Sequence, residues 1–75
     1  DERNMAYAYD LTTALFNLGR TRRKAGAFPA AIADQESSLA ILLELERKGF
    51  AHGDLKGDIE LTHTEIEKAN RGDKS

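Results

Sequence analysis

The stretch from Thr12 to Leu45, TTALFNLGRTRRKAGAFPAAIADQESSLAILLEL, decides the fold class of this chain. Its apolar residues recur every three or four positions on both sides of the segment Gly26–Pro29, which is the spacing of a helix face. Glycine ends helices readily because it adopts left-handed backbone angles, and proline suits the first turn of the next helix. The stretch therefore predicts two helices joined by a tight turn, over residues 4–25 and 29–48.

The residues after Gly49 predict a third helix of a different kind. Asp54 is a suitable N-cap, and a helix over residues 54–70 carries its apolar and small residues on one side only. That stripe consists of Leu55, Ile59, Thr62, Ile66 and Ala69. Residues 71–75 are polar and are expected to form a flexible tail. The sequence thus predicts a single all-α domain of three helices, of which the first two are apolar around most of their circumference.

Composition limits the other structures and functions that the chain can have. Its 75 residues form one domain at most, and without cysteine they contain neither a disulfide nor a thiolate metal site. The apolar runs are far shorter than the ~20 residues of a membrane-spanning helix. The lack of cysteine favours a cytoplasmic location. The formal net charge is −2, with basic residues concentrated from Arg20 to Lys24, and this acidic balance argues against nucleic-acid binding.

Four short segments carry a resemblance to a known family. They are Leu15–Gly19, Gly26–Phe28, Ala31–Ile32 and Ser38–Ile41. With small residues at fixed places, they resemble one tetratricopeptide repeat, a helix pair of about 34 residues. The long first helix is similar to those of bacterial repeats that occur in arrays beside kinase or nucleotide-hydrolase domains. The chain departs from the family pattern at three positions, Arg22, Gln35 and Leu43, where a large apolar residue, an aromatic and a proline are usual.

The resemblance implies how the first two helices pack. Leu15 and Leu18 would fill the contact between them, while Gly19 and Ala31 would let the two backbones approach closely. A glycine inside a helix costs about 1 kcal/mol relative to alanine, so close packing is the physical reason to place one there.

The resemblance also implies a place in a larger assembly. Arrays of such repeats need about three units for stability, so one repeat followed by a one-sided helix implies the C-terminal end of a longer array. The third helix would be a capping helix, and the whole a fragment of a right-handed superhelix. The first helix would expose a face meant for a preceding repeat, and an isolated chain would bury this face, around Tyr7, Leu11 and Ala14, by self-association.

The expected function follows from the face that the first helix presents. In this family the first helix of each pair lines a concave groove that receives peptides. Here the residues of that face would be Thr13, Phe16, Asn17, Arg20, Arg23 and Lys24. Arginine offers a planar fork to carboxylates, and asparagine both donates and accepts hydrogen bonds along a peptide backbone. We expect a protein-interaction module that binds an acidic segment or a C-terminal carboxylate of a protein partner.

Two other functions remain open at the level of sequence. The segment could serve only to cap an array or to mediate oligomerisation. It could also be a helix-turn-helix that binds DNA through the basic run from Arg20 to Lys24, although the helix after the turn begins with acidic residues.

Catalytic and metal-binding motifs are weak. His52–Lys56 resembles the catalytic loop of protein kinases, but Ile59 stands where that loop requires asparagine. His63 and Glu67 lie one helical turn apart and provide two metal ligands without a third. We therefore expect no enzymatic activity, no cofactor and no bound metal.

Overall fold

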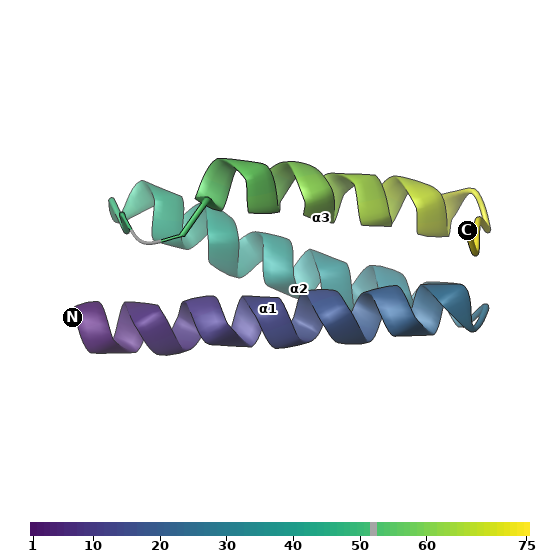
Figure 1. Cartoon of the computed structure of the whole chain (residues 1–75), viewed down its shortest axis with the longest axis horizontal. Coiled ribbons are helices and arrows are strands. Elements are labelled where there is room, and N and C mark those ends of the chain that lie inside the picture. Colours follow the sequence, from purple (N-terminus) through teal and green to yellow (C-terminus); the bar gives the residue numbers. More distant parts are fainter. Residues whose placement is uncertain (52) are drawn as a thin grey trace.

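Three helices make up the described part of the chain. The computed structural model describes residues 1–51 and 53–75, with α1 over Glu2–Lys24, α2 over Phe28–Arg47 and α3 over Leu55–Asn70. α1 and α3 run in the same direction, and α2 runs the opposite way behind them and packs against both (Figure 1). No strand occurs among the described residues, so the predicted all-α class is confirmed.

Local interactions place the helix ends near the positions that the sequence indicates. α1 begins at Glu2, two residues earlier than expected, because the Asp1 carboxylate accepts hydrogen bonds from two backbone N–H groups of the first turn at 2.7 and 3.1 Å. Asp54 caps α3 as predicted and accepts a first-turn N–H at 3.0 Å. Between α1 and α2, Gly26 has a φ of +86°, the left-handed angle expected of it.

The interfaces between the helices contain few large apolar side chains. The buried apolar residues are Ala31, Leu42, Leu45, Phe50 and Ala69, and the buried polar ones are Thr12, Arg23, Gln35, Ser38, Thr62 and Glu65. A buried polar group is costly unless it has a hydrogen-bond partner. The Ser38 hydroxyl, for example, donates to the Thr12 carbonyl at 3.1 Å and so joins α2 to α1. The core is thin, as expected of a chain this short.

Gly19 lies where α1 and α2 approach closely, as predicted. A Cβ atom at this position would lie 2.6 Å from Gln35 Nε2 and 3.2 Å from the Ala31 carbonyl oxygen. Gln35 Nε2 in turn donates to the Phe16 carbonyl oxygen at 2.9 Å. The space left by glycine therefore admits a buried glutamine, which bonds the two helices at a position where the repeat pattern has an aromatic residue.

One apolar stripe of α1 does not pack against the rest of the chain. Tyr7, Leu11 and Leu18 are 66, 51 and 42% exposed, and Ala14 between them is exposed as well. Their spacing puts them on one side of the helix, which faces neither α2 nor α3. The exposed face expected around Tyr7 is thus present. The expectation that Leu18 fills the contact between α1 and α2 was wrong, because Leu18 belongs to this outward stripe. Leu15, on a neighbouring side of the helix, is half-buried.

Candidate functional site

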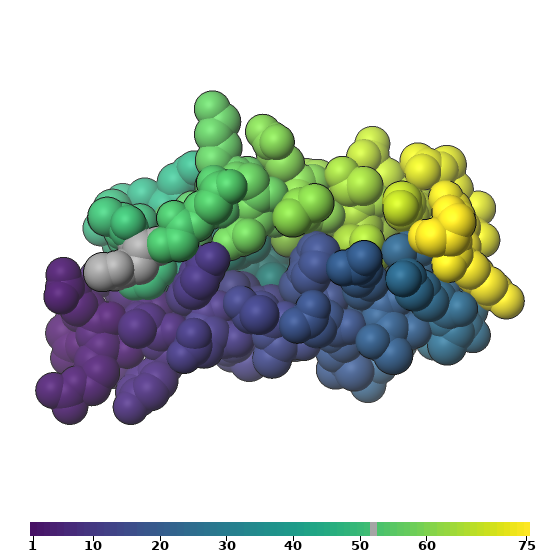
Figure 2. Space-filling view, in the orientation of Figure 1, coloured from purple at the N-terminus to yellow at the C-terminus, as the bar shows by residue number. Residues whose placement is uncertain are grey.

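A small cavity lies between α1 and α3, the two helices that form the face of the molecule seen in Figure 2. Its volume is about 80 Å³. α2 contributes its floor. The lining residues are Thr12, Thr13, Phe16, Ser38, Leu42, Asp58, Leu61 and Thr62, and we call this surface the α1–α3 groove.

The floor of the α1–α3 groove is less polar than its residue types indicate. The hydroxyl groups of Thr12, Ser38 and Thr62 donate to backbone carbonyl oxygens at 2.6, 3.1 and 2.7 Å. Because these donors are already engaged, the two threonines offer mainly their methyl groups to an incoming group, next to the apolar side chain of Leu42. The cavity therefore suits an apolar group better than a polar one.

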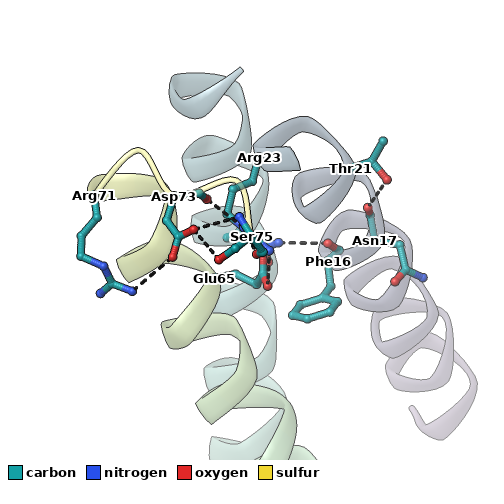
Figure 3. A network of polar contacts seen from close by, with 9 residues as sticks. Phe16, Asn17, Thr21, Arg23, Glu65, Arg71, Asp73 and Ser75 are labelled. Carbon is teal, nitrogen blue, oxygen red and sulfur yellow. Dashed lines mark hydrogen bonds and ion pairs between the residues drawn. The ribbon is translucent and has the colours of Figure 1, made fainter. Parts of the chain in front are cut away.

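Phe16 and Leu61 form the mouth of the groove. The Phe16 ring lies between α1 and α3 (Figure 3), and it is half-buried. Leu61 is 56% exposed on the facing side of the cavity. Sequence reasoning missed Leu61 because it lies off the apolar stripe of α3. The sequence feature that could have indicated Leu61 is its position as a single leucine on a polar helix face, next to Glu60 and one turn before Thr64.

A hydrogen bond between side chains joins α1 to α3 at one end of the groove. The Tyr9 hydroxyl donates to Asp58 Oδ2 at 2.6 Å, and the Tyr9 ring packs against Phe50 with ring centroids 5.6 Å apart. The hydrogen bond to Asp58, together with burial and the carboxylate charge, raises the pKa of Tyr9 above its ordinary value. No sequence pattern pointed to Tyr9, because its partner is 49 positions away.

A buried ion pair joins the same two helices beyond the other end of the groove. Arg23 is 1% exposed, and its guanidinium donates to both carboxylate oxygens of Glu65 at 2.7 and 3.3 Å (Figure 3). This corrects the prediction that Arg23 belongs to an exposed, ligand-binding ribbon. Arg23 turns inward because Glu65 lies opposite it on α3, and its charge is satisfied within the chain.

Arg23 also holds the C-terminal residues. Its Nη1 donates to the carbonyl oxygens of Asp73 and Ser75 at 2.8 and 2.7 Å. The Asp73 carboxylate accepts hydrogen bonds from the Ser75 hydroxyl and, at 2.8 Å, from the Ser75 N–H, and both lower the pKa of Asp73. The tail predicted to be flexible is therefore bonded to the helices in this structure.

The other residues of the predicted ribbon do not all face the groove. Thr13 and Phe16 line it, whereas the Asn17 amide lies on the side of α1 away from α3 (Figure 3). Arg20 and Lys24 are exposed, and neither forms an ion pair within the part of the chain that the structure describes.

The basic run in α1 is half neutralised by the fold. Arg22 pairs with Asp34 on α2 at 3.0 Å, and Arg23 pairs with Glu65. Among the described residues, Arg20 and Lys24 therefore supply the positive charge of this run that has no acidic partner.

The described residues form no metal site and no membrane-spanning helix. No three His, Cys, Asp or Glu side chains in residues 1–51 and 53–75 lie close enough to hold a metal ion. Asp54 of the kinase-like motif serves as the N-cap of α3, and His52 lies outside the described residues. None of the three helices is both long enough and apolar enough to cross a membrane.

Neither a protein-family model, a curated protein nor a solved structure matches this chain.

The Tyr9–Asp58 hydrogen bond predicts a pH dependence. A group whose pKa is raised by folding contributes stability that is present below its unfolded-state pKa and is lost as the pH rises through the folded-state value. In a Tyr7→Phe variant, Tyr9 is the remaining tyrosine, so its tyrosinate absorbance should titrate with a midpoint above the ordinary value of about 10. Adding Asp58→Asn should lower this midpoint because it removes the neighbouring negative charge. An identical midpoint in both variants would contradict the assigned contact.

The buried ion pair predicts a non-additive effect on stability. Arg23→Met or Glu65→Leu alone should lower the free energy of unfolding by roughly 3–5 kcal/mol, because each leaves an uncompensated buried charge. The double variant should be more stable than either single variant. Arg22→Met is the matched control: its pair with Asp34 is partly exposed, and its loss should cost about 1 kcal/mol or less. Urea denaturation followed by circular dichroism measures all four, and additive losses in the double variant would refute the assignment.

Proposed function

We propose that this chain is a protein-interaction module that binds a peptide segment of a partner protein in the α1–α3 groove. The observation that carries the proposal is the cavity itself. It is lined largely by apolar atoms and opens between two parallel helices, one helical turn from Arg20, which forms no ion pair with the described residues. An apolar recess beside a few polar groups is the usual form of a binding site on a protein surface.

The packing order of the helices supports a tetratricopeptide-like arrangement. α2 packs antiparallel against α1, and α3 packs on α2 while running parallel to α1 (Figure 1). α1 and α3 then correspond to the first helices of successive pairs, which in the family line the peptide groove. The close approach of Gly19 to Ala31 agrees with the small residues of the repeat pattern. We infer that α3 is the capping helix of such an array.

The charges around the groove favour an acidic partner. Arg20 follows Phe16 by one turn and is exposed beside the groove, and Lys24 is exposed one turn further along α1, on the side that carries Asn17. The acidic groups at this end, Glu65 and Asp73, already have cations of their own. A carboxylate that enters here therefore meets net positive charge.

Charge reversal tests the proposed function. Arg20→Glu combined with Lys24→Glu should weaken the binding of acidic peptides by roughly tenfold or more, because each lost pair is worth up to about 1 kcal/mol and each new contact is repulsive. Arg47→Glu combined with Lys48→Glu makes the same change of charge on an exposed end of α2 and is the matched control. Fluorescence anisotropy with labelled peptides measures the affinities. An equal loss in both variants, or no loss in the first, would exclude the groove as the site.

The exposed stripe of α1 supports a second role, the docking of further helices. Tyr7, Leu11 and Leu18 form an apolar surface along α1 that is typical of a helix that packs against a neighbour. We propose that this stripe packs against the preceding pair of an array, and that the isolated chain buries it by self-association.

The self-association of the isolated chain is directly measurable. Light scattering should give a mass above that of the monomer at high concentration, and Leu11→Glu combined with Leu18→Glu should restore the monomer mass, because a charge replaces each apolar contact. Leu43→Glu, a comparably exposed leucine on α2, should leave the association unchanged. A monomer mass for the unmodified chain at every concentration would refute this second role.

A further inference from the structure

We infer that two copies of this chain pair through α1 in an antiparallel arrangement, about a two-fold axis at the level of Phe16, with Asp10 of each copy beside the partner's Lys24. This pairing rests on the self-association proposed above and specifies its geometry. Three features of the surface carry it: the spacing of the exposed stripe on α1, the charges on one flank of that stripe, and the small residues on α2.

The exposed stripe of α1 has the spacing of a coiled-coil seam. Its members follow one another at alternating intervals of four and three residues, which is the pattern that lets two helices pack along their length. We call this set the outer seam, and it consists of the exposed residues Tyr7, Leu11, Ala14, Leu18, Thr21 and Ala25. The Thr21 hydroxyl donates to the Asn17 carbonyl oxygen at 3.0 Å, so its methyl group is the part left to pack.

The sizes of the seam residues favour an antiparallel partner. In a two-fold pair with its axis at the level of Phe16, residues equally far before and after Phe16 face one another. The facing pairs are Tyr7 with Ala25, Leu11 with Thr21, and Leu18 with Ala14. Each pair joins a larger side chain to a smaller one, which fills the layers evenly. A parallel pair would set Tyr7 against Tyr7 and Ala14 against Ala14, which crowds one layer and leaves a gap in another.

The two flanks of the outer seam differ in what they face. One flank carries Ala8 and Arg22 and lies toward α2. Ala8 lines a shallow hollow together with Ala40 of α2, and Arg22 pairs with Asp34 of α2 at 3.0 Å. The opposite flank lies away from both other helices, as the Asn17 amide shows in Figure 3. This second flank is therefore the one that can meet the charges of another molecule.

The charges of the free flank set the register. The flank consists of four exposed residues at intervals of one heptad, Arg3, Asp10, Asn17 and Lys24. Neither Asp10 nor Lys24 forms an ion pair within the part of the chain that the structure describes. With the axis at the level of Phe16, Asp10 meets the partner's Lys24, and the symmetric contact forms as well. An axis half a heptad nearer the N-terminus would instead bring Arg3 beside the partner's Lys24, two like charges.

Small residues on α2 leave room for the partner's α2. Because α2 lies on the Arg22 flank of both copies, the two-fold axis places the two α2 helices side by side. On this side α2 carries the exposed residues Ala33, Ser37 and Ala40. Gln35 donates to the Phe16 carbonyl oxygen at 2.9 Å, so Ala33 and Ala40 lie on either side of the level of the axis. Small side chains let two helices approach closely, so the interface extends from α1 onto α2.

Exchange of the two charges tests the register. Asp10→Lys and Lys24→Asp each turn both attractive contacts into repulsive ones, so each should raise the dissociation constant of the dimer by about tenfold or more. The double variant restores both contacts and should associate like the unmodified chain. An equimolar mixture of the two single variants should also associate, because the mixed dimer joins opposite charges at both contacts. Sedimentation equilibrium measures these constants.

Matched controls make the same changes of charge away from the outer seam. Glu60→Lys and Lys56→Asp alter exposed positions of α3 and should leave the association of the chain unchanged. Circular dichroism verifies that every variant is folded, and the mixture of the two Asp10 and Lys24 variants shows that both remain able to pair.

Distances between copies test the orientation. The chain has no cysteine, so Arg3→Cys and Asn17→Cys each provide a single site for a nitroxide label. In the antiparallel pair the labels at Asn17 should lie close together, beside the axis, whereas those at Arg3 should be roughly 40 Å apart along the helices. A parallel pair would bring both kinds of label close together. Electron paramagnetic resonance distinguishes the two cases.

The outcomes separate this pairing from the self-association and from the peptide site. Single charge variants that associate as tightly as the unmodified chain, or short distances at both labels, would overturn the antiparallel pairing and leave association through the stripe in place. A monomer mass for the unmodified chain at every concentration would overturn both. Peptide binding is decided separately, because the α1–α3 groove lies on another side of α1.

Discussion

The ion pair between Arg23 and Glu65 is the interaction on which the arrangement of this chain depends. α1 and α3 make few direct contacts and each packs mainly against α2, so the direct link between them rests on side chains that reach across. Removing two charges from water costs several kcal/mol per ion, and good geometry with further hydrogen bonds is needed to offset that cost. Here the guanidinium meets both carboxylate oxygens and two tail carbonyls, so one residue of α1 holds α3 and the C-terminal residues together.

A second contact between α1 and α3 makes the groove a preorganised surface. Tyr9 and Asp58 close the groove at one end, and Arg23 and Glu65 lie beyond the other. Between these two contacts the helices are spaced by threonines and a serine whose hydroxyls bond to the backbone. Side chains held in this way lose little conformational freedom when a ligand enters, which lowers the cost of binding.

Much of the fold was predictable from the sequence because local interactions determine it. The Asp54 carboxylate caps α3 by accepting the N–H of Gly57 in the first turn, and Gly26 ends α1 through its own left-handed backbone angle. The candidate site was only partly predictable. Periodicity places Phe16, Asn17 and Arg23 near one another on α1, but it does not say where α3 crosses them. Phe16 faces the groove, Asn17 lies beyond it and Arg23 is buried.

The sequence by itself determined the helical class, the approximate helix ends and the close approach at Gly19, since these depend on residues within a few positions of one another or on the absence of a side chain. Only the tertiary structure decided which cations of the basic run remain available. Arg22 and Arg23 are neighbours in the chain and chemically identical, yet one pairs at the surface and the other is buried. The reason is that Glu65, the partner of Arg23, is 42 positions away and comes close to Arg23 only after α3 has packed.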